Sequence, residues 1–153
     1  MTTLGFRSDP KNPRYAIVSR TKDDALVLVN ADDETKLVFP AGAQADEHKI
    51  SWLYNELDRL LHKHPDIAKV VVKKGEFTAG DNNAKRLASY QEATVLLFCA
   101  LKGIPVANKI YASLSTNSSQ VKQHAEARVG KTAKYWDAKM ADAVIAAWWS
   151  EKG

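Results

Sequence analysis

The chain has 153 residues, a formal net charge of +4 and a single cysteine. This length suits one domain that buries roughly two thirds of the surface its unfolded chain would expose, so neither disulfides nor a structural metal are needed. No stretch approaches the ~20 apolar residues that span a bilayer, and the N-terminus lacks the apolar core of a signal peptide. We therefore expect a soluble, cytoplasmic protein with no membrane partner, in which Cys99 is a small buried hydrophobe.

The positive charge is concentrated in the second part of the chain. Residues 1–62 hold 8 basic and 10 acidic side chains, a net charge of −2, whereas residues 63–153 hold 14 and 8, a net charge of +6. This asymmetry is compatible with binding to phosphate groups, but solubility alone accounts for many charges of this size. Charge therefore points to residues 63–153 as the part to search for a binding surface.

The first 40 residues predict an antiparallel meander. Residues 1–14 form a polar segment that we expect to be a flexible lead-in, with a single domain over residues 15–150. The β-branched runs at 15–19 and 25–30 flank a charged turn, which is a hairpin signal, and a third short run at 36–39 stops at Pro40. Three antiparallel strands follow from this pattern.

The middle of the chain changes to a helical period. Apolar residues recur at helical spacing over 46–64, where Asp46 is placed to begin the helix and Pro65 to end it. Residues 70–72 are three valines, typical of a strand buried on both faces. Lys73 and Lys74 end this strand and point to opposite faces of the sheet.

The last 70 residues predict three helices and one more strand. A long helix starts at residue 82 or 83 and stops at Gly103. Its second half is apolar nearly all round, so it is either central to the fold or the contact surface of a homodimer formed through residues 83–102. A short strand at 106–110, a short helix at 120–129 and a helix at 132–150 complete the chain.

The resulting order is β-β-β-α-β-α-β-α, an α/β arrangement with three antiparallel strands, then parallel crossovers, and helices on both faces of a mixed sheet. This order resembles the ribonuclease H-like superfamily and, within it, the RuvC-type Holliday junction resolvases. The resemblance rests on the order and spacing of four segments. These are residues 16–19 with the hairpin after them, residues 70–74 with the Gly/Asn loop and helix after them, residues 119–123, and residues 141–147.

The resemblance also implies a site. Members of this superfamily that cut nucleic acid hold two divalent metals between about four carboxylates. The corresponding positions here are Ser19, Lys74, Lys139 and Asp142, so most of the catalytic carboxylates are missing. Lys139 lies three residues before Asp142 on one helix, and Lys74 could reach the same acid, so we expect internal charge pairs in place of metals. This interpretation of the resemblance favours a protein without enzymatic activity or cofactor over a metal-dependent nuclease.

Three hypotheses about function remain open. The first is a degenerate domain that binds DNA or RNA through a basic surface made of Lys73, Lys74, Lys85, Arg86, Lys122, Arg128 and Lys131. The second is an active Mg²⁺- or Mn²⁺-dependent nuclease with relocated carboxylates, for which Asp142, Glu76 and Glu92 are the metal-ligand candidates. The third is a structural or dimerising domain, in which Lys73 is simply solvated. The sequence has no Gly-rich phosphate loop, nucleophile elbow or zinc-ligand spacing.

Overall fold

The computed structural model describes residues 1–152, which form a five-stranded mixed sheet with helices on both faces. The strands are β1 (Thr2–Arg7), β2 (Arg14–Arg20), β3 (Leu26–Leu28), β4 (Ile67–Lys73) and β5 (Val106–Lys109). Their spatial order is β3-β2-β1-β4-β5. The pairs β1–β2 and β2–β3 are antiparallel, whereas β1–β4 and β4–β5 are parallel.

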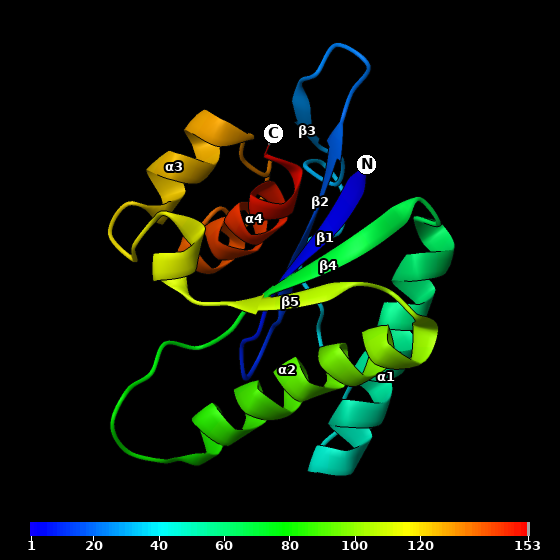
Figure 1. Ribbon diagram of the computed structural model, residues 1–153. Coiled ribbons are helices and arrows are strands. Elements are labelled where there is room, and N and C mark those ends of the chain that lie inside the picture. The colour runs from blue at the N-terminus through cyan, green and yellow to red at the C-terminus, as the bar shows by residue number, and fades with distance from the viewer. Residues whose placement is uncertain (153) are drawn as a thin grey trace.

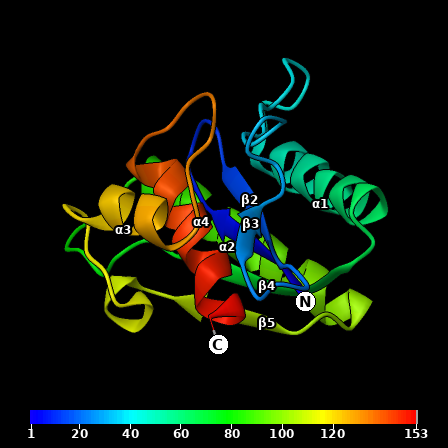
Figure 2. The same ribbon diagram turned by 90° about the horizontal axis from the view of Figure 1, so that it is seen from above.

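Within residues 1–152, four α-helices and one 3-10 helix cover the sheet. They are α1 (Asp46–Lys63), α2 (Asn83–Lys102), the 3-10 helix η1 (Tyr111–Leu114), α3 (Val121–Arg128) and α4 (Ala138–Glu151). The helices α1 and α2 lie on one face, and α4 lies on the other with α3 packed against it (Figure 1 and Figure 2). The predicted order of strands and helices is therefore confirmed.

Each face of the sheet has its own core. On the face covered by α1 and α2 the buried side chains include Leu4, Phe6, Ile17, Leu53, Leu57, Val70, Val72, Val95 and Phe98. On the face covered by α4 they include Ala16, Val18, Leu114, Val121, Met140, Ala143, Val144 and Ala147. Cys99 is buried as expected, and burial raises the pKa of its thiol to about 11. No helix within residues 1–152 combines the length and apolar character that a membrane span requires.

The strands of the meander lie one element earlier than predicted. Residues 15–19 and 25–30 match β2 and β3, and the expected lead-in of residues 1–14 contains β1, which is the central strand. Residues 36–39 form no strand beyond an isolated bridge between Lys36 and Arg14. The prediction of a flexible 1–14 segment was therefore wrong, as was the third strand at 36–39.

β1 was missed because its polar residues look typical of a loop. In the folded chain these residues have partners: Thr3 Oγ1 donates a hydrogen bond to Glu151 at 2.6 Å, and the hydroxyls of Thr2 and Ser19 lie 2.5 Å apart. A buried hydroxyl with a hydrogen-bond partner costs little, so a central strand can contain threonine. Its apolar residues, Leu4 and Phe6, are two positions apart and both point to the face covered by α1 and α2.

Gly5 allows α4 to pack directly against the backbone of β1. A Cβ atom at this position would lie 1.9 Å from the Ala143 carbonyl oxygen and 2.8 Å from the Ala147 nitrogen. Alanines on α4 face the same strand, so two backbones approach without intervening side chains. Glycine is needed here for close approach, because any side chain would push the helix away.

We predict that Gly5→Ala lowers the free energy of unfolding by about 3 kcal/mol, because the added methyl group overlaps backbone atoms that cannot rotate away. Urea denaturation followed by circular dichroism measures this change. Gly42→Ala is the matched control, since nothing lies within 4 Å of the Cβ position there. Equal stabilities for the two variants would contradict the close packing of α4 on β1.

Candidate functional site

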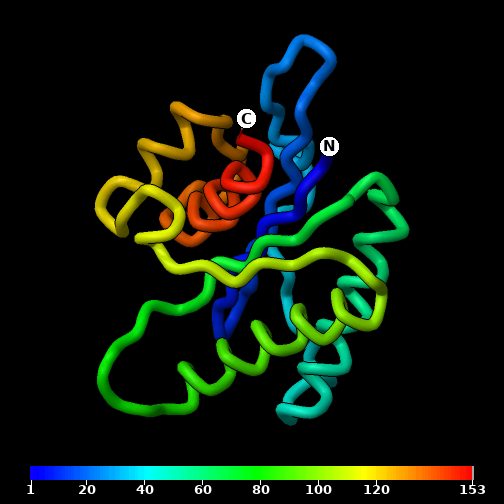
Figure 3. Tube along the Cα trace, in the orientation of Figure 1, coloured from blue at the N-terminus to red at the C-terminus, as the bar shows by residue number. Residues whose placement is uncertain are grey.

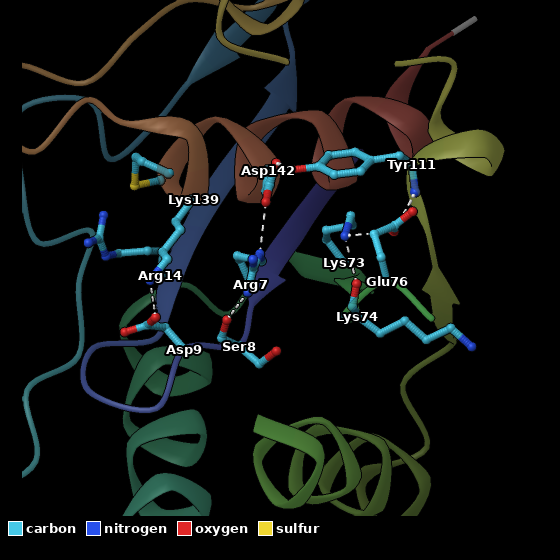
Figure 4. Close-up of polar contacts among 12 residues, drawn as sticks. Arg7, Ser8, Asp9, Arg14, Lys73, Lys74, Glu76, Tyr111, Lys139 and Asp142 are labelled. Carbon is cyan, nitrogen blue, oxygen red and sulfur yellow. Dashed lines mark hydrogen bonds and ion pairs between the residues drawn. The ribbon is translucent and has the colours of Figure 1, made fainter. Parts of the chain in front are cut away.

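The carboxyl ends of β1 and β4 meet at one edge of the sheet, because the two strands are parallel neighbours. Arg7 and Lys73 are register partners at these ends. Asp142 reaches the same edge from α4, and Tyr111 from η1 (Figure 4). Together with Glu76, which follows β4, these residues form what we call the charge centre.

Asp142 is the most deeply buried acid of the charge centre, with 1% of its surface exposed. Arg7 Nε donates a hydrogen bond to Oδ2 at 2.8 Å, and the Tyr111 hydroxyl donates to Oδ1 at 2.7 Å. Burial raises the pKa of Asp142, while Arg7 and Tyr111 oppose this rise. Burial and the neighbouring carboxylate also raise the pKa of Tyr111, so its hydroxyl remains a hydrogen-bond donor.

Lys73 is a buried cation, also 1% exposed. Its Nζ lies 3.1 Å from Glu76 Oε2, donates to the Lys74 carbonyl at 2.7 Å, and sits 4.0 Å from the centroid of the Tyr111 ring. The backbone N–H of Tyr111 also donates to Glu76 Oε2, at 3.1 Å. Burial tends to raise the pKa of Glu76, but the Tyr111 N–H and Lys73 together hold it below its usual value.

A second pair, Asp9 and Lys139, lies beside the charge centre (Figure 4). Lys139 Nζ donates a hydrogen bond to Asp9 Oδ1. The second carboxylate oxygen, Oδ2, accepts hydrogen bonds from the backbone nitrogens of Asn12, at 2.9 Å, and Lys11, at 3.2 Å. Burial would raise the pKa of Asp9, but the hydrogen bonds from Lys139 and from these backbone groups lower it overall. The pair fixes the loop after β1 to the start of α4.

Two residues of α2 connect the loops at this edge. Gln91 exchanges hydrogen bonds with the backbone of Asp9, accepting from its nitrogen at 3.0 Å and donating to its oxygen at 2.8 Å. Glu92 accepts hydrogen bonds from the Ser8 hydroxyl and from the Gly75 nitrogen. The loops after β1 and β4 are therefore both attached to the same helix.

The predicted pairings of Asp142 with Lys74 and Lys139 were wrong. Lys139 pairs with Asp9 instead, and the Lys74 ammonium lies 4.8 Å from the centroid of the Phe77 ring. Figure 4 shows the Lys74 side chain extending away from Asp142. The physical reason is strand alternation: α4 covers the face of the sheet to which Lys73 points, so Lys73 is buried and Lys74 is not.

Ser19 does not lie at the charge centre. It belongs to β2, where its hydroxyl contacts Thr2. With β1 as the first strand, the residue at the corresponding strand end is Arg7, which sequence reasoning missed. The alternation Leu4, Phe6 was the available signal for β1, but Tyr111 gave no signal, because its place depends on the packing of η1 against α4.

The metal pair implied by the resemblance does not fit these residues. Within residues 1–152, no three or more His, Cys, Asp or Glu side chains come together as metal ligands. The candidates are held by separate partners: Asp142 by Arg7 and Tyr111, Glu76 by Lys73, and Glu92 by Ser8 and Gly75. Fixed cations at both strand ends would also repel a divalent ion.

Lys73, expected either on a basic surface or solvated, is instead buried and leaves the predicted surface. The other basic residues of that surface lie in two parts of the molecule. Lys74 and Lys85 line a cavity of about 300 Å³ that also borders Glu76, Phe77 and Glu92. Arg86 follows Lys85 in α2 but borders a different cavity, with Lys49 and Tyr90, and pairs with Asp81 at 2.6 Å. The second group is Lys122, Arg128 and Lys131, on α3 and just after it, beyond the other face of the sheet (Figure 1). In this group the Arg128 guanidinium stacks 4.3 Å from the Trp148 ring.

We predict that Arg7→Met lowers the free energy of unfolding by about 3 kcal/mol, because it leaves the buried Asp142 carboxylate without its counter-ion. Adding Asp142→Asn should recover part of this loss, since the amide oxygen can still accept from Tyr111. Denaturation by urea, which is uncharged and does not screen ion pairs, checks both variants. Arg86→Met is the control: its ion pair with Asp81 is more than half exposed, so its loss should change stability little. Equal losses at the two arginines would argue against a buried pair.

No family model matches the sequence, and no curated protein sequence matches it. Solved structures do match. RuvC of T. thermophilus in complex with a Holliday junction aligns with a TM-score of 0.76 at 14% identity, over 97% of this chain and 92% of that one. The yeast mitochondrial Holliday junction resolvase Ydc2 gives 0.65 at 15%, over 97% and 79%. The fowlpox virus Holliday junction resolvase gives 0.58 at 12%, over 99% of both chains. The chain thus shares the RNase H-like fold with these proteins, as predicted.

Proposed function

We propose that the chain is a catalytically degenerate RuvC-type domain that acts by binding nucleic acid. The observation that most directly supports this proposal is the 2.8 Å ion pair between Arg7 and Asp142 at the end of the central strand, next to the buried Lys73. Structurally similar proteins, RuvC and the fowlpox virus resolvase, have been captured with Holliday junction DNA. Branched DNA is therefore the first ligand to test.

The loss of catalysis follows from electrostatics. Two-metal cleavage needs carboxylates that together offset two divalent cations and position them on the attacking and leaving oxygens. Here the strand ends carry a guanidinium and an ammonium group, and each acid beside them already has a cation or hydrogen-bond donors as its partners. A divalent ion would have to displace these groups and accept their repulsion at short range.

The loop between β4 and α2 is the best binding surface beside the charge centre. Phe77 is 80% exposed on it, and Lys74 and Lys85 line the adjacent cavity. Lysines contact phosphates without sequence preference, and an exposed aromatic ring can stack on an unpaired base. A branched or partly single-stranded nucleic acid supplies both phosphates and unstacked bases, which favours it over an intact duplex.

We predict salt-sensitive binding to a four-way junction in EDTA, with an affinity that Mn²⁺ does not increase and with no strand cleavage. Fluorescence anisotropy and denaturing gels measure the two properties. Lys74→Gln should weaken binding at all salt concentrations and reduce the salt slope by about 1, because one phosphate contact is lost. Lys22→Gln is the matched control, since Lys22 is exposed in the β2–β3 turn at the opposite end of the sheet.

Other outcomes would favour the remaining hypotheses. Mn²⁺-dependent cleavage, or stoichiometric metal binding in calorimetry that Asp142→Asn abolishes, would support a nuclease with relocated carboxylates such as Asp142, Glu76 and Glu92. Absence of binding to DNA and RNA at low salt would overturn the nucleic-acid proposal and leave a protein-interaction domain.

A second proposal concerns α2 as the contact surface of a homodimer. Tyr90, Leu97 and Leu101 are 36%, 54% and 66% exposed and fall at helical spacing along one side of the helix. Exposed apolar side chains gathered on one stripe are more typical of a protein contact than scattered ones. Two of these exposed residues, Leu97 and Leu101, belong to the second half of the helix, for which the sequence predicted an apolar surface.

We predict that Leu97→Glu converts a dimer into a folded monomer with an unchanged circular dichroism spectrum, because the residue is 54% exposed and supports no intramolecular core. Sedimentation equilibrium at several protein concentrations measures the change. Val38→Glu is the control, as Val38 is also an exposed apolar residue, 59% accessible, outside α2. A wild-type chain that stays monomeric at high concentration would contradict this proposal.

A further inference from the structure

The loop from residue 75 to residue 82 runs far from the sheet between β4 and α2 (Figure 3). Its second half is held by α2: Lys85 Nζ donates to the carbonyl of Ala79 at 2.6 Å and to that of Gly80 at 3.3 Å. Asn82 caps the helix by accepting from the Lys85 nitrogen at 2.9 Å. These contacts fix where the loop ends.

The first half of the loop is held by the charge centre. Glu76 Oε2 lies 3.1 Å from Lys73 Nζ and accepts the Tyr111 backbone N–H at 3.1 Å (Figure 4). The preceding residue, Gly75, donates its N–H to Glu92. Phe77 follows directly and has 80% of its surface exposed. Glu76 is thus the last anchored side chain before the exposed aromatic ring.

We infer that Glu76 is a positioning residue that orders the proposed binding loop by tying it to the buried Lys73. The inference rests on the proposed function, because it assigns the loop to nucleic-acid binding. In this arrangement the groups at the ends of β1 and β4 hold a binding element in place. Glu76 itself need not touch nucleic acid.

The attachment is buried at its Lys73 end, while the Glu76 side chain is 38% exposed. A buried ammonium group requires a counter-ion, and the one that Lys73 pairs with at 3.1 Å belongs to the loop. The backbone N–H of Tyr111, the first residue of η1, donates to the same oxygen, Glu76 Oε2. This one oxygen therefore connects the loop both to Lys73 of β4 and to η1. An exposed ion pair would be screened by water and would hold the loop much less firmly.

The sign of the effect on DNA affinity separates positioning from simple electrostatics. Glu76→Ala and Asp81→Ala each remove one negative charge from the same loop, and Asp81 forms an exposed pair with Arg86. Less negative charge near phosphate should tighten binding in both variants. If Glu76 positions the loop, Glu76→Ala should instead weaken DNA binding, whereas Asp81→Ala should still tighten it. The expected loss of affinity is about tenfold, the size expected from losing a charge-assisted hydrogen bond.

Amide hydrogen exchange provides a readout that does not depend on DNA. In Glu76→Ala, the amide of Tyr111, which donates to this carboxylate, should exchange about tenfold faster, and so should the amide of Gly75, whose bond to Glu92 depends on an ordered loop. Glu76→Gln keeps an acceptor oxygen and should restore most of the protection and affinity. The double variant Lys73→Met/Glu76→Ala has the wild-type net charge and no unpaired buried lysine, so it folds even if Glu76→Ala does not, and it should show the same loose loop.

The outcomes of this experiment are distinguishable from those of the proposed function. If wild-type protein binds no nucleic acid, the proposed function fails while the exchange data still test the anchor. Unchanged exchange of the Gly75 amide in both Ala-containing variants would overturn the inference whatever the DNA results. Faster exchange with undiminished affinity would overturn it too, because the order of the loop would then be irrelevant to binding.

Discussion

The buried ion pair between Arg7 and Asp142 is the interaction on which the arrangement of this edge of the sheet depends. Both groups lose hydration when α4 packs on β1, and this cost is offset only when the guanidinium and carboxylate meet with good geometry. The 2.8 Å contact, with Tyr111 on the second carboxylate oxygen, meets that condition. It therefore fixes β1, η1 and α4 relative to one another, and α4 can approach that closely because residue 5 has no side chain.

The order of elements could be predicted from the sequence because it depends on local patterns. Helical spacing identified α1, the glycine at 103 ended α2, and three valines identified β4. The first strand could not be identified in this way, since Thr2, Thr3 and Gly5 are acceptable there only through Glu151, Ser19 and the backbone of α4. Those partners are far away in the sequence, so the whole meander was assigned one element too late.

The same limit applied to the site. Asp142 and a lysine at the end of β4 were identified, but their partners were not, because pairing depends on which face of the sheet each helix covers. Alternation placed Lys73 and Lys74 on opposite faces, and only the position of α4 decides that Lys73 is the buried one. Arg7 became visible once β1 was the first strand, and Glu76 once η1 brought the Tyr111 N–H beside it.

The burial of Lys73 also determines which residues at this edge of the sheet could contact a phosphate group. A metal ion in an open site can contact phosphate directly, whereas Lys73 is enclosed by Glu76, Tyr111 and the Lys74 carbonyl and cannot reach a ligand. Any phosphate must then be met by groups outside the charge centre, of which Lys74 and the loop after it are the nearest. Because Glu76 belongs to that loop and pairs with Lys73, the enclosed cation can still influence binding, through the order it imposes on the loop.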